Sequence, residues 1–337
     1  GAAAVPPATQ ALARFASTLA WESIPPEVIA HAKLCVLDAL GCCLFGSGLP
    51  ATRILIETIV DQGGAPQAGI WGTSHKTSAS QAALANCAAG HSFELDDLHT
   101  AGLLHATTLA VPAALALAER RDCSGRDLLA ACIAGFETGL RVGIAGTHGL
   151  FNRGFHPQGT SGVFCSAVAS ARMLDLNEQQ TANAIGIAAS MACGLMAAQE
   201  GAMTKRFHSG HAGQSGVMAA LLASRSYTGM PDALEHTHGG FLDVYSDKPA
   251  PELLLAGLGD TWETLAIGFK AYPTVSCIHG PLAMLDEIMR TNNLCADDIA
   301  TVDVACSTFT YRHTVWPYRA SGLTEAQMNL FYGMSVM

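Results

Sequence analysis

Apolar residues recur with a helical period along most of the first 230 residues. Between Pro25-Pro26 and about Phe45, large aliphatic residues return every three to five positions, which predicts one long helix. Ser124, followed by Asp127, is a capping pair that predicts the start of another. The same pattern predicts further helices over residues 50–60, 78–90, 106–121, 125–144, 160–174, 178–197 and 211–226. Short linkers between them indicate a compact bundle.

The pattern changes after Phe241. Residues 280–291 have a helical pattern, whereas 265–269 and 301–307 are typical of short strands, the latter with a period of two. We therefore predict a mainly α fold, with a large helical domain over residues 1–261 and a smaller α+β lid domain over 262–337. Because the sequence stops inside an apolar segment, 325–337, we expect the lid domain to be incomplete at its C-terminal end.

Charge is scarce in this sequence of 337 residues. Lys and Arg number 18 and Asp and Glu 28, a net charge of −10, and charged residues make up only 14% of the chain, against about 25% in ordinary soluble domains. The acidic balance argues against a nucleic-acid partner. A surface with so few charges predicts a subunit interface, and we expect a homodimer.

The eleven cysteines form no C-x-x-C pair, and their number is odd. They are typical of small core residues in a reducing compartment, so we expect a cytoplasmic protein or, in a eukaryote, one of the mitochondrial matrix. The long uncharged stretches, 98–118 and 181–199, are interrupted by polar residues, Gly or Pro, and predict buried helices rather than a membrane span.

Histidines gather with acids and glycines in otherwise apolar surroundings, while the common nucleotide-binding, serine-hydrolase and zinc-protease motifs are absent. The clusters are His91–His105, Gly154–Pro157, Met203–His211 and Cys277–Pro281. The first allows a divalent metal site built from His91, Asp96, Asp97 and His99, an acid/base site, or a plain helix terminus. Its spacing lacks the regularity of helical metal ligands, so we favour acid/base chemistry.

Lys205-Arg206 is a cationic pair between long apolar segments. On its own it fits side chains that reach water at the start of a helix. Next to glycines and to His208 and His211, it also fits an anion site that would hold a substrate carboxylate or a developing enolate.

In this order, the clusters resemble the MmgE/PrpD family, which includes 2-methylcitrate dehydratase, cis-aconitate decarboxylase and iminodisuccinate epimerase. The matching segments are Phe93–His105, Gly154–His156, Cys193–Met196 with Met203–Lys205, Gly239–Leu242, and Phe269–Pro273 through His279. The likeness spans essentially the whole chain. Phe93–His105 and Ala192–Lys205 are most similar to the fungal cis-aconitate decarboxylase branch.

The resemblance implies a helical domain with a lid, a homodimer, and catalysis without a metal or organic cofactor. It places the family's active-site positions on Glu94, His105, His156, Lys205 and His279, and a lid tyrosine on Tyr332. In that scheme Lys205 stabilises negative charge, and His105 or His279 transfers protons. Glu94 and Asp97 orient or tune an imidazole, while His156 binds a carboxylate.

The expected function is a cofactor-independent lyase acting next to a carboxylate of a small di- or tricarboxylate, of cis-aconitate decarboxylase or 2-methylcitrate dehydratase type. Two alternatives stay open. One is an epimerase of a dicarboxylate, and the other is a catalytically inactive carboxylate-binding or scaffold protein.

Overall fold

The computed structural model of the protein describes residues 7–121 and 123–337, apart from the side chains of residues 147 and 148. The chain is mainly α-helical, as predicted. Its α-helices are α1 (Ala8–Thr18), α2 (Pro26–Gly46), α3 (Pro50–Gln62), α4 (Ala79–His91), α5 (Thr107–Ala118), α6 (Gly125–Asn152), α7 (Gly162–Met173), α8 (Glu178–Ala189), α9 (Thr204–Ala223), α10 (Phe241–Tyr245), α11 (His279–Asn292), α12 (Thr308–Thr314), α13 (Leu323–Met328) and α14 (Leu330–Ser335).

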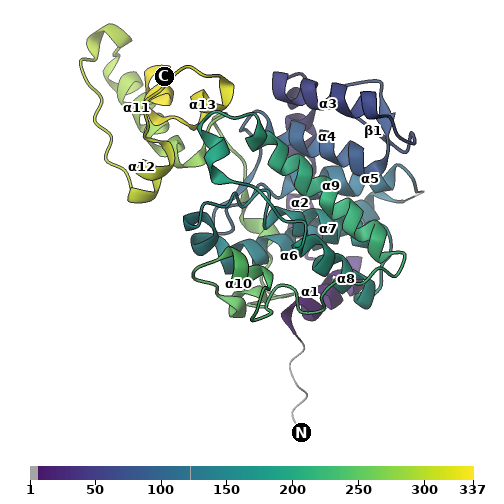
Figure 1. The fold of residues 1–337 in the computed structure, drawn as a ribbon. Coiled ribbons are helices and arrows are strands. Elements are labelled where there is room, and N and C mark those ends of the chain that lie inside the picture. Colours follow the sequence, from purple (N-terminus) through teal and green to yellow (C-terminus); the bar gives the residue numbers. More distant parts are fainter. Residues whose placement is uncertain (1–6, 122) are drawn as a thin grey trace.

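Close helix packing forms the centre of the molecule. α7 packs against α5, α6 and α9, and α9 also packs along α4 (Figure 1). Small residues make these approaches possible: a Cβ on Gly210 of α9 would lie 2.6 Å from the carbonyl oxygen of Leu84 in α4. A Cβ on Gly139 of α6 would lie 2.2 Å from Cys165 Sγ. The many small residues therefore allow the helices to pack closely, at the density typical of protein interiors.

Most predicted helices form within a few residues of their expected ends, and Ser124 caps α6 with Asp127 as predicted. Three boundaries differ. The helix predicted to end at residue 144 continues to Asn152. The helix predicted to reach residue 197 ends at Ala189, and the chain then passes through Gly194 at φ 142° before a short 3-10 turn, Met196–Glu200. The helix predicted from residue 211 already begins at Thr204. This earlier start places Lys205 and Arg206 in the first turn of α9.

Two short antiparallel sheets lie among the described residues. β1 (Ala68–Gly69) pairs with β2 (Lys76–Thr77). β3 (Leu98–His99) pairs with β4 (Ile267–Gly268), with Leu98 opposite Gly268 and His99 opposite Ile267. This second pairing joins the loop before α5 to the segment that leads to Lys270, two parts of the chain that are far apart in sequence.

The C-terminal region, residues 270–337, has a small core of its own. The main core runs from Leu12 to Ile267, whereas Val275, Ile278, Leu282, Met328 and Leu330 form a separate cluster. In Figure 1, α11 to α14 lie together to one side of the helical core. The domain boundary at 261/262 stays a prediction.

The strand content predicted for this region is mostly wrong. Residues 301–306 form no strand, and the stretch 265–269 contributes only the two residues of β4. The alternating residues Val302, Val304 and Cys306 instead line an apolar groove with α11 and α14. A strand needs a partner strand. In the described chain, this segment lies beside α11 and α14 instead.

Two helices are long and apolar enough to cross a membrane by length and composition alone: α2 and residues 125–146 of α6. The α6 segment is mostly buried in the core, as in many globular proteins. α2 is less buried and exposes several large apolar side chains. Six of the eleven cysteines, among them Cys43, Cys87 and Cys132, are buried as predicted, whereas Cys193, Cys295 and Cys306 are exposed.

Candidate active site

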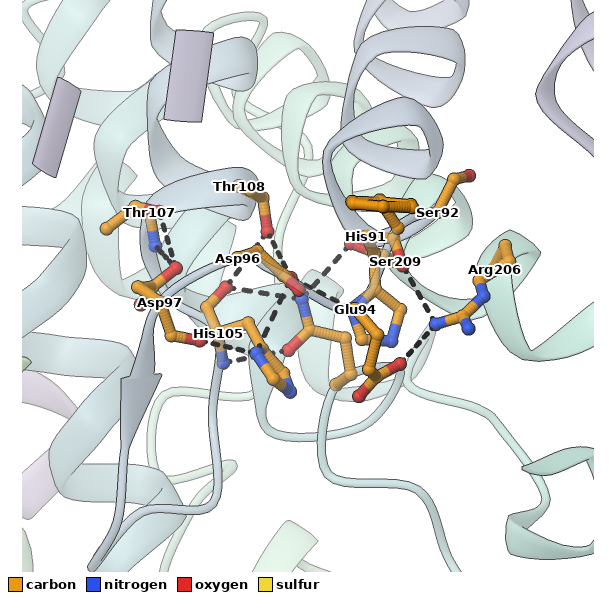
Figure 2. A network of polar contacts seen from close by, with 12 residues as sticks. His91, Ser92, Glu94, Asp96, Asp97, His105, Thr107, Thr108, Arg206 and Ser209 are labelled. Carbon is orange, nitrogen blue, oxygen red and sulfur yellow. Dashed lines mark hydrogen bonds and ion pairs between the residues drawn. The ribbon is translucent and has the colours of Figure 1, made fainter. Parts of the chain in front are cut away.

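The first histidine cluster lies in the loop that joins α4 to α5. α4 ends at His91 and α5 begins at Thr107, so residues 92–106 leave the helical core and return to it. The acids of this loop are buried: Glu94 is 2% exposed, and Asp96 and Asp97 are fully buried. Because burying an unpaired charge is costly, the partners of these carboxyl groups define the site (Figure 2).

Glu94 is surrounded by three cations. Its carboxylate accepts hydrogen bonds from Lys205 Nζ at 2.7 Å and from Arg206 Nη1, and Lys270 Nζ lies 3.4 Å from it. Lys270 Nζ also donates to the Glu94 carbonyl oxygen at 3.0 Å. Burial alone would raise the pKa of Glu94, but the charges of Lys205, Lys270 and Arg206 hold it well below its usual range. The residue has φ 58°, a left-handed conformation that is costly for any residue with a Cβ.

A hydrogen-bonded chain runs from Lys205 through His91 to Asp96. Lys205 Nζ lies 3.2 Å from His91 Nε2, and His91 Nδ1 lies 2.9 Å from Asp96 Oδ2. An ammonium group only donates, so Nε2 accepts and Nδ1 carries the proton that is donated to Asp96. Burial, followed by the nearby Lys205 charge, lowers the pKa of His91 to about 3, so the imidazole is neutral. Burial also lowers the pKa of Lys205, to about 8, although Glu94 opposes this shift.

His105 is held by the backbone of Asp97. His105 Nδ1 lies at hydrogen-bond distance from the Asp97 carbonyl oxygen, which can only accept, so Nδ1 carries a proton and Nε2 keeps a lone pair. Burial lowers the pKa of His105. The Asp97 side chain accepts from Thr107, and burial together with the charge of Asp96 raises its pKa well above the usual range. Asp97 therefore positions His105 and caps α5.

A second pair of histidines adjoins the first. His156 Nδ1 lies 3.0 Å from His208 Nδ1, and the rings of His91 and His156 are 5.8 Å apart between centroids. Burial and the Lys205 charge lower the pKa of His156 well below its usual range and that of His208 to about 4. Both imidazoles are therefore neutral at pH 7. One Nδ1 donates and the other accepts, so the tautomers of the two rings are coupled.

These groups meet at a cavity of about 70 Å³ between the helical core and the C-terminal region, which has room for about five water molecules. Its charged and titratable lining residues are Glu94, His105, His156, Lys205, Lys270 and His313. Its apolar lining includes Leu98, Leu103, Phe151, Pro157, Met196, Val275, Phe309 and Met328. The size fits a small acid rather than a polymer. Among the residues that line the cavity, Lys205 and Lys270 carry two positive charges against the single carboxylate of Glu94, which leaves an excess of positive charge at the cavity wall.

Two predicted site residues lie elsewhere. His279 begins α11, bonds the Thr274 carbonyl oxygen at 3.2 Å and packs its ring edge against Tyr272. The turn before it presents Ser276 and Cys277 to the cavity instead. Tyr332 packs against Tyr318 and lines a different pocket. The structure thus gathers Glu94, His105, His156 and Lys205, places Asp97 behind them, and does not bring His279 or Tyr332 to the cavity. The proton-transfer role of His279 and the lid role of Tyr332 stay predictions.

Sequence reasoning missed several residues of this site. Lys270 belongs to the segment Phe269–Pro273, which carries part of the family resemblance, but the motif gave this lysine no role. His91 was noted only as a candidate metal ligand. Gln199 and His313 line the cavity and stood in no cluster. The pairing of β3 with β4 brings Lys270 to the cavity, and the packing of His313 against Phe151 brings α12 there.

The metal site weighed for the first cluster is not assembled. His99 bonds Glu263 at 3.1 Å and the amide of Gly102, away from His91 and Asp96, and Asp97 bonds Thr107. His91, Asp96 and His105 do offer ligand atoms within 4.8 Å of one another. However, His91 Nε2 faces the Lys205 ammonium and Nδ1 donates to Asp96. This donor set is arranged for proton sharing beside a cation, which is a poor environment for a second positive charge.

Comparison with known proteins agrees with this picture. The MmgE/PrpD N-terminal domain matches residues 10–254. A cis-aconitate decarboxylase of Aspergillus terreus (strain NIH 2624) is 32% identical over 97% of this chain and 71% of the relative. A cis-aconitate decarboxylase-like protein of Aspergillus oryzae is 32% identical over 96% of this chain and 72% of the relative. A match over most of the helical core, with relatives aligned along nearly the whole chain, places this protein in the MmgE/PrpD family.

Proposed function

We propose that this protein is a lyase that acts by acid/base chemistry next to a carboxylate of a small di- or tricarboxylate. One observation carries the proposal: a small buried cavity combines excess positive charge from Lys205 and Lys270 with neutral imidazoles from His105 and His156. Cations attract a multiply charged acid, and neutral imidazoles are available to transfer protons.

Lys205 and Lys270 would bind the substrate carboxylates, and Lys205 would stabilise the negative charge that develops when a proton leaves the adjacent carbon or a carboxyl group is lost. The ammonium already lies 2.7 Å from Glu94. It is therefore oriented before the substrate enters, which is the condition under which electrostatic stabilisation is most effective.

His105 is the proposed proton-transfer group. Its Nδ1 proton is committed to the Asp97 carbonyl, which leaves the Nε2 lone pair for the substrate. Neutral in the free protein, it is suited to remove a proton, as dehydration requires. Decarboxylation needs a proton donor instead. The negative charge of a bound polycarboxylate raises the pKa of a nearby imidazole, so substrate binding itself would favour protonation of His105.

Among lyases we propose cis-aconitate decarboxylation first and 2-methylcitrate dehydration second. The relatives from Aspergillus, identical at about one position in three along nearly the whole chain, support the first. An epimerase remains a second candidate, because His105 and His156 both line the cavity and epimerisation needs two proton-transfer groups.

The proposed enzyme is a homodimer. α2 exposes Leu37 by 68%, Leu44 by 55% and Phe45 by 57%, together with Leu34 one turn earlier. These positions form an apolar stripe on a helix whose other face packs in the core. A contiguous exposed apolar stripe is typical of an interface between subunits.

Proton NMR in D₂O tests the function directly. Purified protein is incubated with cis-aconitate and, separately, with 2-methylcitrate, each with and without EDTA, and a Lys205→Met variant serves as the control. A decarboxylase gives itaconate with one solvent deuteron per molecule and releases carbon dioxide. A dehydratase gives an alkene from methylcitrate. Deuterium exchange without net conversion identifies an epimerase, whereas no change in any arm refutes the proposal. Activity lost in EDTA and restored by a divalent ion would refute the metal-independent mechanism.

A further inference from the structure

One wall of the cavity carries polar atoms that have no partner. His313 Nδ1 and Gln199 Oε1 are buried without a hydrogen-bond partner among the described residues, and both side chains line the cavity. His313 is 9% exposed and Gln199 8%. A buried polar atom left unpaired costs free energy that the fold must supply. Neither residue belongs to the positions that the family resemblance supplied.

The position of His313 is fixed by aromatic contacts. It lies one turn after Phe309 on α12, and its ring packs at 5.4 Å from Phe309 and edge-on at 5.2 Å from Phe151 at the end of α6. The two phenyl rings leave the imidazole little freedom to turn away. An unpaired nitrogen that is held in place beside a cavity is arranged for a ligand rather than for the fold.

His313 is also electrically part of the same site. Burial, and then the Lys205 charge, lower the pKa of His313 to about 4, so the ring is neutral at pH 7. A neutral imidazole carries one N–H donor, on either Nδ1 or Nε2, and the other nitrogen accepts. Toward a carboxylate, the favoured tautomer carries the proton on Nδ1.

We propose that His313 and Gln199 form a second carboxylate-binding subsite, in which His313 Nδ1 donates a hydrogen bond to a carboxylate of the substrate distinct from the one held by Lys205 and Lys270. The Gln199 amide turns about its terminal bond to present its NH₂ group to the same carboxylate. This inference rests on the proposed function, because it presumes an acid with at least two carboxylates. The contact joins α12 to the substrate and therefore makes the C-terminal region part of substrate recognition.

The test compares two replacements of His313. His313→Asn keeps a donor at the position of Nδ1, whereas His313→Leu keeps the bulk and removes the donor. His236→Leu is the control for loss of a histidine, because His236 bonds Asp232 and lies outside this cavity. The readouts are KM and kcat for cis-aconitate, and the melting temperature with and without propane-1,2,3-tricarboxylate, a saturated acid without a reactive double bond.

If the inference is right, His313→Leu raises KM by about 10- to 100-fold, the loss expected for one hydrogen bond to a charged group. His313→Asn stays within a few-fold of the wild type. The ligand-free His313→Leu protein melts at or above the wild-type temperature, because an unpaired polar atom has been removed, but loses most of the rise that the tricarboxylate produces.

Three outcomes overturn the inference, and each has a different meaning. Unchanged KM with a lower melting temperature in His313→Leu shows that His313 is a packing residue whose Nδ1 bonds a buried water. A wild-type protein that neither turns over cis-aconitate nor gains stability from the tricarboxylate removes the proposed function as well. Equal loss of affinity in the Asn and Leu variants shows that ring packing, and not the Nδ1 donor, accounts for the effect.

Discussion

Replacing Lys205 by Met removes the ammonium group and keeps the apolar stem of the side chain. Glu94 retains Arg206 and Lys270 as partners, so no carboxylate is left buried and unpaired, and we expect the fold to persist. Loss of a preorganised cation that stabilises developing negative charge typically lowers kcat by about 10²- to 10³-fold. We expect a loss of that size for turnover of cis-aconitate.

The pH dependence of the wild type makes the same test quantitative. With a pKa of about 8 for Lys205, roughly 90% of the free enzyme carries the charge at pH 7 and roughly 10% at pH 9. kcat/KM should therefore fall about tenfold between these two values. In Lys205→Arg the guanidinium keeps its charge, and the alkaline decline should move beyond pH 10 in whatever activity remains. In the substrate complex, the nearby carboxylates raise the pKa of Lys205, so kcat should decline at a higher pH than kcat/KM.

Arg206 provides the matched control for Lys205. It donates to the same Glu94 oxygen, to the His91 carbonyl and to Gln327, but it does not line the cavity. Arg206→Met should lower stability and keep the alkaline decline of kcat/KM, moved above pH 8 because the Arg206 charge helps to lower the pKa of Lys205. If the residual activity of Lys205→Met declines with pH as the wild type does, the group that titrates near pH 8 is not Lys205 and the assignment fails.

Three further predictions follow from single contacts. Glu94→Gln leaves three cations without their shared carboxylate, and the free energy of unfolding should fall by about 3–5 kcal/mol in urea titrations at pH 7. Because the pKa of Glu94 is depressed in the fold, the difference from the wild type should shrink as the pH falls below 4.5; a constant difference would contradict this. His208→Leu removes the partner of His156 Nδ1 and should lower kcat about fivefold to tenfold. His208→Asn, whose side-chain amide can donate to or accept from His156 Nδ1, should retain most of the activity. Equal losses in the Leu and Asn variants would exclude a positioning role. Leu37→Glu on α2 should convert a dimer to a monomer in sedimentation velocity; a wild-type monomer would refute the proposed interface.

The sequence could predict the helices because their apolar faces and caps are local features. Ser124 and Asp127 mark the start of α6 within three residues of one another, and the structure confirms them. The strand expected at 301–307 fails for the opposite reason. Its alternation predicts a half-buried strand, but residues 301–307 are exposed apart from the partly buried Val304. Whether such a segment finds a partner strand depends on parts of the chain that lie far away in the sequence.

In the site, too, local features could be predicted from the sequence, whereas features that depend on distant contacts could not. Histidines and acids crowded into a chain poor in charge indicate chemistry, and Glu94, His105, His156 and Lys205 do meet at one cavity. The order of residues along the chain does not show which side chain of residues 269–279 faces that cavity. The helix that begins at His279 keeps its ring beside Tyr272, while Lys270 nine residues earlier reaches Glu94. From the sequence alone, Lys270 would be placed on the surface. The pairing of β3 with β4 buries its side chain.

The site also carries energetic costs that the proposed anionic substrate would offset in part. Glu94 adopts φ 58°, a conformation that costs about 1–2 kcal/mol for a residue with a Cβ. Asp96 Oδ1, Gln199 Oε1 and His313 Nδ1 have no partner among the described residues. In the cavity wall, the two lysines Lys205 and Lys270 outnumber the one carboxylate, Glu94. Each of these features lowers the stability of the empty protein, and a bound polycarboxylate would offset the positive charge and accept a hydrogen bond from His313 Nδ1. The closely packed helices α4 and α9, held together through Gly210, supply the rigidity that keeps such an arrangement in place before the substrate arrives.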